Sequence, residues 1–170
     1  MPIDYGRLTL KDALDLAILI EDEARQRYTE FTEMLGARYP GDAADFFSMM
    51  AGYETRHARA LALRRRRLFG SSKREVHGSM FTDVEAPDYG RPRPFMSPRQ
   101  AMEVALEAEE KAFEFYDQAL PKVKDGDVAA LFTDLRAEEQ EHAAAIRAKM
   151  QGLPSGPDLE DEDADEPPAM

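Results

Sequence analysis

The chain of 170 residues contains no cysteine and no tryptophan. The absence of cysteine excludes disulfide bonds, zinc–thiolate sites and iron–sulfur clusters, because all of them need cysteine sulfur. Valine, isoleucine and threonine are sparse, whereas alanine, glutamate, leucine, arginine and methionine are plentiful, which favours helices over strands. With 43% hydrophobic residues, the chain is still able to form one domain with a packed core.

Basic residues are in the minority, and the net charge is −12. Residues 158–166 alone carry seven acids and no base, so the rest of the chain is only mildly acidic and nucleic acid is not an expected partner. Long apolar runs are also missing, because stretches such as residues 16–20 are far too short to span a membrane. The first residues lack the basic and apolar regions of a signal peptide. We expect a soluble, cytoplasmic protein that does not bind a membrane.

Four segments have apolar side chains at spacings of three and four, which is typical of amphipathic helices. We expect these helices at about residues 9–35, 42–67, 97–120 and 127–150. Ser97, Pro98 and Gln100 form a capping signature at the start of the third. Short links predict antiparallel pairing of the first helix with the second and of the third with the fourth. The connection at about residues 68–96 is much longer, and a crossover along a bundle explains its length.

The sequence therefore predicts an all-α fold, with one four-helix bundle over residues 1–152 and a long crossover between the second and third helices. Residues 153–170 are acidic and contain prolines, so we expect a disordered tail. The arginine run at residues 64–67 is interpreted as a solvated helix end, with an anion-binding patch as the alternative. His77 lies in the crossover without a partner motif, and we expect it at the surface.

Polar side chains interrupt the apolar stripe of every predicted helix. Each stripe has a glutamate near its middle, and in two helices a histidine follows three residues later; the set is Glu21, Glu54, His57, Glu109, Glu139 and His142. A single Glu-x-x-His motif is a weak signal, but here four helices agree in phase. Four unpaired buried carboxylates would cost several kcal/mol each, against a domain stability of about 5–15 kcal/mol.

Two divalent cations would balance the four negative charges of these glutamates. Oxygen and nitrogen ligands suit iron or manganese, and a glutamate and a histidine three residues apart share one helix face. The six residues therefore predict a two-metal site. The alternative is a bundle that binds no metal, with its glutamates exposed or protonated.

The chain repeats the pattern Glu-x-x-Ala-x-x-x-Tyr at residues 21–28 and 109–116. The repeat predicts two similar helical hairpins that face each other across an approximate twofold axis. Tyr28 and Tyr116 share the face of their glutamates, and their hydroxyls are predicted to hydrogen-bond to carboxylate ligands or to a neighbouring helix. Core filling is an equal alternative for both tyrosines.

The combined motifs resemble the ferritin-like di-iron carboxylate superfamily, and its rubrerythrin branch most. The matching stretches are IEDEARQRY at 20–28, YETRH at 53–57, AEEKAFEFY at 108–116 and EEQEH at 138–142. The resemblance implies a ferritin-like bundle with two iron ions, or manganese, that acts on hydrogen peroxide or dioxygen. It also implies a role in oxidative stress and, by analogy, a homodimer.

Two departures from the rubrerythrin pattern bear on the activity. Many rubrerythrins carry a rubredoxin module with four cysteines, so the electron donor of this chain would be another protein. Rubrerythrins also commonly have a glutamate three residues after the ligand of the third helix, where this chain has Ala112, and Glu110 and Glu114 point to other faces. We favour a peroxidase, with a ferroxidase that uses dioxygen and a non-catalytic helical bundle as alternatives.

Overall fold

The computed structural model describes residues 3–76 and 84–153. Over these residues the protein has long helices and no strand, which confirms the predicted all-α bundle. The helices are α1 (Leu10–Leu35), α2 (Ala43–Phe69), α3 (Pro98–Ala119) and α4 (Gly126–Gln151), with 3₁₀ turns η1 (Tyr5–Arg7) and η3 (Leu120–Lys122). His77 and most of the predicted tail, residues 154–170, lie outside the described residues.

Each long helix begins after a side chain that accepts a hydrogen bond from a backbone N–H of the first turn. These caps are Thr9, Asp42, Ser97 and Asp125. The predicted capping box is confirmed, because the side chain of Gln100 in turn accepts from the backbone N–H of Ser97. Gly36 and Gly70 end α1 and α2 with φ near +60°, a conformation that other residues rarely adopt. The helix boundaries are therefore set by local capping chemistry.

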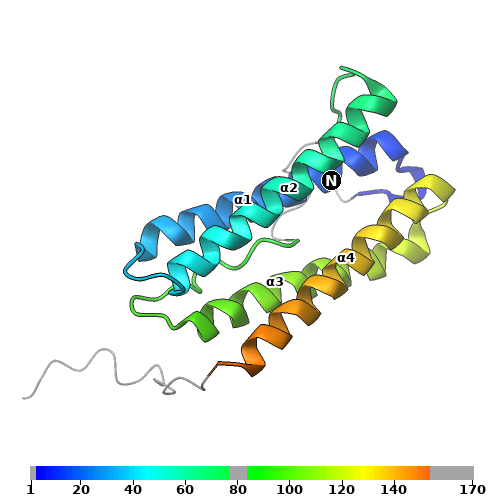
Figure 1. Ribbon diagram of the computed structural model, residues 1–170. Helices are drawn as coiled ribbons and strands as arrows, with labels where there is room; N and C mark the ends of the chain where they lie inside the picture. Colours follow the sequence, from blue (N-terminus) through cyan, green and yellow to red (C-terminus); the bar gives the residue numbers. More distant parts are fainter. Residues whose placement is uncertain (1–2, 77–83, 154–170) are drawn as a thin grey trace, which may run out of the picture.

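The helices pack as two antiparallel hairpins, α1 with α2 and α3 with α4 (Figure 1). After α2, the chain returns along the bundle, so that α2 and α3 run in the same direction (Figure 1). This is the predicted crossover, whose described residues between the two helices are 70–76 and 84–97. No helix in the described part of the chain is long and apolar enough to cross a membrane.

The hydrophobic core consists of two clusters. One cluster contains Leu14, Ile20, Tyr116 and Phe132, whereas the other contains Ala24, Tyr28, Phe31 and Phe47. In α1, Ile20 of the first cluster and Ala24 of the second flank Glu21, and the glutamates of the other three helices lie between the clusters in the same way. A polar layer thus separates two apolar halves of the bundle.

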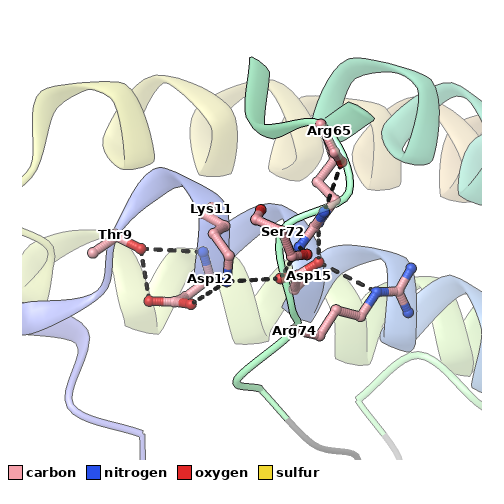
Figure 2. A network of polar contacts seen from close by, with 8 residues as sticks. Thr9, Lys11, Asp12, Asp15, Arg65, Ser72 and Arg74 are labelled. Carbon is pink, nitrogen blue, oxygen red and sulfur yellow. Dashed lines mark hydrogen bonds and ion pairs between the residues drawn. The ribbon is translucent and has the colours of Figure 1, made fainter. Parts of the chain in front are cut away.

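A buried ion pair fastens the end of α2 to α1 (Figure 2). Arg65 donates to the two carboxylate oxygens of Asp15 at 2.5 Å and 3.1 Å, and Asp15 is fully buried. Arg65 also donates to the carbonyl oxygens of Gly70 and Ser72, and Arg74 lies 3.3 Å from Asp15. The first residues of the crossover are therefore held against α1.

This ion pair corrects one prediction about the arginine run at residues 64–67. A solvated helix end is found for three of these arginines, which are exposed. The prediction is wrong for Arg65, which is only 7% exposed. Asp15, fifty residues earlier in the chain, supplies the buried carboxylate that offsets the cost of burying this charge.

Candidate metal centre

The bundle brings the six predicted ligands together in its polar layer, and each hairpin contributes three. One triad is Glu21 of α1 with Glu54 and His57 of α2, and the other is Glu109 of α3 with Glu139 and His142 of α4. Within each triad, one possible ligand atom from every residue lies within 4.8 Å of the others. We refer to the two triads, together with the polar layer that they form, as "the centre".

The four glutamates of the triads are almost completely shielded from solvent. Their exposed fractions are 1%, 1%, 0% and 1% in chain order. Each has one oxygen without a hydrogen-bond partner among the residues that the structure describes; these atoms are Glu21 Oε2, Glu54 Oε2, Glu109 Oε1 and Glu139 Oε2. A buried, unsatisfied acceptor costs about 1–3 kcal/mol, and more when it is charged. Cations between these oxygens would remove that cost.

The two histidine rings stack on each other across the gap between the hairpins. The ring centroids of His57 and His142 lie 4.8 Å apart, and the planes differ by 9°. Nδ1 of His142 lies 3.1 Å from Glu109 Oε2 and 3.5 Å from Glu139 Oε2. Nδ1 of His57 lies 3.6 Å from one oxygen of each glutamate in its own triad. In both triads, therefore, the imidazole nitrogen faces the two carboxylates with which it would share an ion.

The histidines form the side of the centre that faces solvent. Their side chains are 25% and 29% exposed, unlike the glutamates. Both rings line a pocket of about 380 Å³ between α2 and α4, whose wall also includes Arg64, Asp134 and Glu138. The pocket therefore lies on the histidine side of the centre.

Burial and neighbouring charges shift the pKa values of the centre. Burial raises the pKa of Glu21 to about 8, although His57 acts in the opposite direction, and burial also raises the pKa of Glu139 well above its usual range. The two nearby carboxylates of its triad, Glu21 and Glu54, raise the pKa of His57 to about 10. Burial lowers the pKa of His142, but its two glutamates outweigh this effect and raise it to about 11. Without metal, the centre therefore holds protons that a cation must displace.

Tyr28 and Tyr116 are completely buried on opposite sides of the polar layer, one in each hydrophobic cluster. Neither hydroxyl has a hydrogen-bond partner among the described residues. Burial raises the pKa of both phenols, and the negative charge of Glu109 adds to this for Tyr28, as that of Glu139 does for Tyr116. Both tyrosines fill the core beside the centre, while a hydrogen bond to a metal-bound carboxylate stays a prediction.

The crossover adds a side chain that the sequence analysis missed. Glu85 is 1% exposed, and its carboxylate lies within 4.8 Å of ligand atoms from both triads. Burial, followed by the charges of the four triad glutamates, raises its pKa well above the usual range. Glu85 belongs to no helix, so no periodic stripe marks its position. The local signal is limited to its apolar neighbours Val84, Ala86 and Pro87, which is too short a run to show periodicity.

Comparison with known families gives a match over most of the chain. A sequence model of the family described as Rubrerythrin matches residues 12–150, a range that spans the crossover and all four helices except the first two residues of α1 and the last residue of α4. The chain belongs to the rubrerythrin family. This membership confirms the resemblance inferred from the four ligand motifs.

Two solved structures are similar to this member of the rubrerythrin family. An uncharacterized conserved protein from Magnetospirillum magnetotacticum is 29% identical, with 88% of this chain and 98% of that chain covered and a TM-score of 0.67. A hypothetical protein from Pyrococcus furiosus is 21% identical, with 85% and 89% covered and a TM-score of 0.54, which supports the fold alone. No curated protein matches the chain.

The donor set of the centre fits the two metal ions that the rubrerythrin family implies. Each triad offers carboxylate oxygens and an imidazole nitrogen, which suit iron or manganese. The unpartnered buried oxygens are a second, independent sign of fit, because they belong to carboxylates whose possible ligand atoms lie within 4.8 Å of one another inside each triad.

Proposed function

We propose that this rubrerythrin-family protein binds two iron ions in the centre and reduces hydrogen peroxide to water, with electrons from a separate donor protein. One ion would be held by each triad, the first by Glu21, Glu54 and His57 and the second by Glu109, Glu139 and His142. The observation that carries this proposal is the pair of buried triads, each with two carboxylates and one imidazole. Four carboxylates balance the charge of two ferrous ions.

Bound iron would supply one electron from each ferrous ion, which matches the two-electron cleavage of the O–O bond of peroxide. The protein supplies the shielding, because an apolar cluster on each side of the centre keeps bulk water away. Reduction of peroxide to two waters also consumes two protons. The buried phenols of Tyr28 and Tyr116 keep their protons at neutral pH and lie next to the carboxylate layer. They are therefore suited to hold a proton for a nearby carboxylate.

The pocket beside the histidines suits a small polar oxidant. Its wall combines Arg64, Asp134 and Glu138 with the edges of both imidazoles. Peroxide and hydrated ferrous ions are small enough for such an opening. Entry at this side would bring them to the histidines first and to the buried glutamates afterwards.

A ferroxidase is the second candidate, in which iron is the substrate and dioxygen the oxidant. The absence of cysteine favours it, because the chain brings no rubredoxin module of its own to deliver electrons. A ferroxidase needs no donor, since each incoming ferrous ion carries its own electron. The same six side chains would bind the iron during its oxidation.

Reaction of the iron-loaded protein with each oxidant separates these functions. The apo-protein is loaded with ferrous iron without air, and its oxidation by peroxide and by dioxygen is followed by stopped-flow absorbance. A peroxidase predicts fast, stoichiometric oxidation by peroxide and slow oxidation by dioxygen. Turnover of many irons per chain with dioxygen would favour the ferroxidase instead.

A pair of variants on α4 controls this experiment. Glu139→Gln removes a buried carboxylate of the centre, whereas Glu141→Gln changes an exposed glutamate of the same helix. We expect the first variant to lose most of the fast phase and the second to retain it. If only trace iron binds, or if the two variants react alike, the proposed centre is wrong.

A further inference from the structure

Glu85 occupies a position that links the two triads. It forms one cluster with Glu21 and Glu139, and a second with Glu54 and Glu109. Each of these clusters takes one glutamate from either triad, and in each the ligand atoms lie within 4.8 Å of one another. The carboxylate of Glu85 therefore lies between the two proposed metal positions.

The carboxylate of Glu85 makes no hydrogen bond to the residues that the structure describes. Both of its oxygens are buried without a hydrogen-bond partner among the described residues, whereas each triad glutamate has one such oxygen. With an exposed fraction of 1%, the group gains little from water. Two unsatisfied oxygens at one buried carboxylate are costly unless a ligand satisfies them. This distinguishes Glu85 from an acidic side chain that merely lies near other acids.

Two cations from different helices hold the backbone beside Glu85 in place. Arg27 of α1 is 3% exposed and donates to the carbonyl oxygen of Pro87. Lys111 of α3 donates to the carbonyl oxygen of Ala86 at 2.9 Å. The crossover is thus fixed to both hairpins at the two residues that follow Glu85. A carboxylate held in this way is preorganised in the centre.

We propose that Glu85 is a seventh ligand, a carboxylate from the crossover that is shared between the two metal ions. This role rests on the proposed two-metal centre. It also has a consequence for charge, because five carboxylates exceed the charge of two ferrous ions by one. This excess negative charge is balanced when one of the ferrous ions is oxidised to the ferric state. The charge of Glu85 therefore favours the oxidised pair of ions and lowers its reduction potential.

The test compares Glu85→Gln with the wild-type full-length chain. Ferrous iron is titrated into each apo-protein without air, and the bound iron, its affinity and the reduction potential of the loaded protein are measured. For Glu85→Gln, we expect an affinity lower by about tenfold or more and a higher reduction potential. Glu75→Gln, an exposed glutamate of the same crossover, should behave like the wild type.

Two further variants separate ligation from a structural effect. Glu85→Asp keeps the charge but shortens the side chain, and we expect a reduction potential closer to the wild type than that of Glu85→Gln. Lys111→Met keeps the Glu85 carboxylate but removes one of the two hydrogen bonds that hold the backbone beside it. We therefore expect a smaller loss of iron affinity than for Glu85→Gln. Circular dichroism and thermal unfolding of each apo-protein show whether the bundle is intact.

The possible outcomes test the role of Glu85 separately from the existence of the two-metal centre. If the wild type binds two irons and Glu85→Gln matches it in affinity and potential, Glu85 is not a ligand and the six-residue centre stands. If the wild type binds no iron, the centre and the role of Glu85 are both wrong. A lower affinity and a raised potential in Glu85→Gln, but not in Glu75→Gln, support the proposal.

Discussion

Glu109 shows at the scale of one residue how the centre is built. It is fully buried, one of its oxygens lies 3.1 Å from Nδ1 of His142, and the other has no partner among the described residues. The arrangement is unfavourable for a metal-free carboxylate and favourable beside a cation. The site could be predicted from the sequence for the same reason, because a glutamate in an apolar stripe needs a compensating charge that the core does not supply.

The hydroxyls of Tyr28 and Tyr116 give a prediction at this scale. Both are buried without a hydrogen-bond partner among the described residues, so the phenylalanine variants should leave the apo-protein as stable as before or stabilise it by about 1 kcal/mol. Urea unfolding of the metal-free variants measures this change. If the hydroxyls bond to carboxylates when iron is bound, the same variants should slow the oxidation of the loaded protein. A clear loss of apo-protein stability would show instead that the hydroxyls have partners.

At the scale of elements, the four helices could be predicted because each carries its own local signals. Periodic apolar residues gave their extent, and caps such as Ser97 gave their starts. The six triad residues followed because a helix face is fixed by spacing. Glu85 and the Asp15–Arg65 pair could not be found in this way, since both depend on contacts between segments far apart in the sequence.

The Asp15–Arg65 pair gives a prediction about the junction of α1, α2 and the crossover. Asp15→Ala leaves a buried guanidinium without its carboxylate, so we expect a loss of about 3–5 kcal/mol in the free energy of unfolding. Urea unfolding measures the loss. Asp22→Ala removes an exposed partner of Arg25 on the same helix and should cost less than about 1 kcal/mol.

A double variant tests whether the pair acts through charge or through packing. Asp15→Leu with Arg65→Met replaces both charges with apolar groups and should recover much of the lost stability. Equal losses in Asp15→Ala and Asp22→Ala would contradict the assigned role of the buried pair.

At the scale of the whole molecule, two hairpins enclose a polar layer between two apolar clusters. Each hairpin contributes one triad, as the sequence repeat predicts. Glu85 departs from this symmetry, because the crossover occurs only once in the chain. The two triads are therefore equivalent in composition, whereas Glu85 is a single carboxylate that lies near both of them. The homodimer and the external electron donor stay predictions.

The raised pKa values predict how stability depends on pH. The native metal-free protein holds a proton on Glu21 up to about pH 8 and on His57 up to about pH 10, whereas the ordinary pKa values of these side chains are 4.5 and 6.5. The native state therefore binds more protons than the unfolded state across this window, so the stability of the apo-protein should fall as the pH rises from about 5 to 10.

Metal binding should reverse this trend, because a cation displaces the same protons and competes better at high pH. Chemical unfolding at several pH values, with and without manganese as a redox-stable probe, measures both curves. We expect the stabilisation by metal to grow with pH. An apo-protein that becomes more stable between pH 6 and 9 would contradict the assigned pKa shifts. Glu21→Gln serves as the control and should flatten the lower part of the apo-protein curve.

The most direct test of the two-metal centre is an anomalous difference map of the iron-loaded crystal, recorded at the iron absorption edge. A two-metal centre predicts two peaks inside the bundle, one beside Glu21, Glu54 and His57 and the other beside Glu109, Glu139 and His142. Peaks only at the surface, or no peak within the polar layer of a crystal soaked with iron without air, would contradict it.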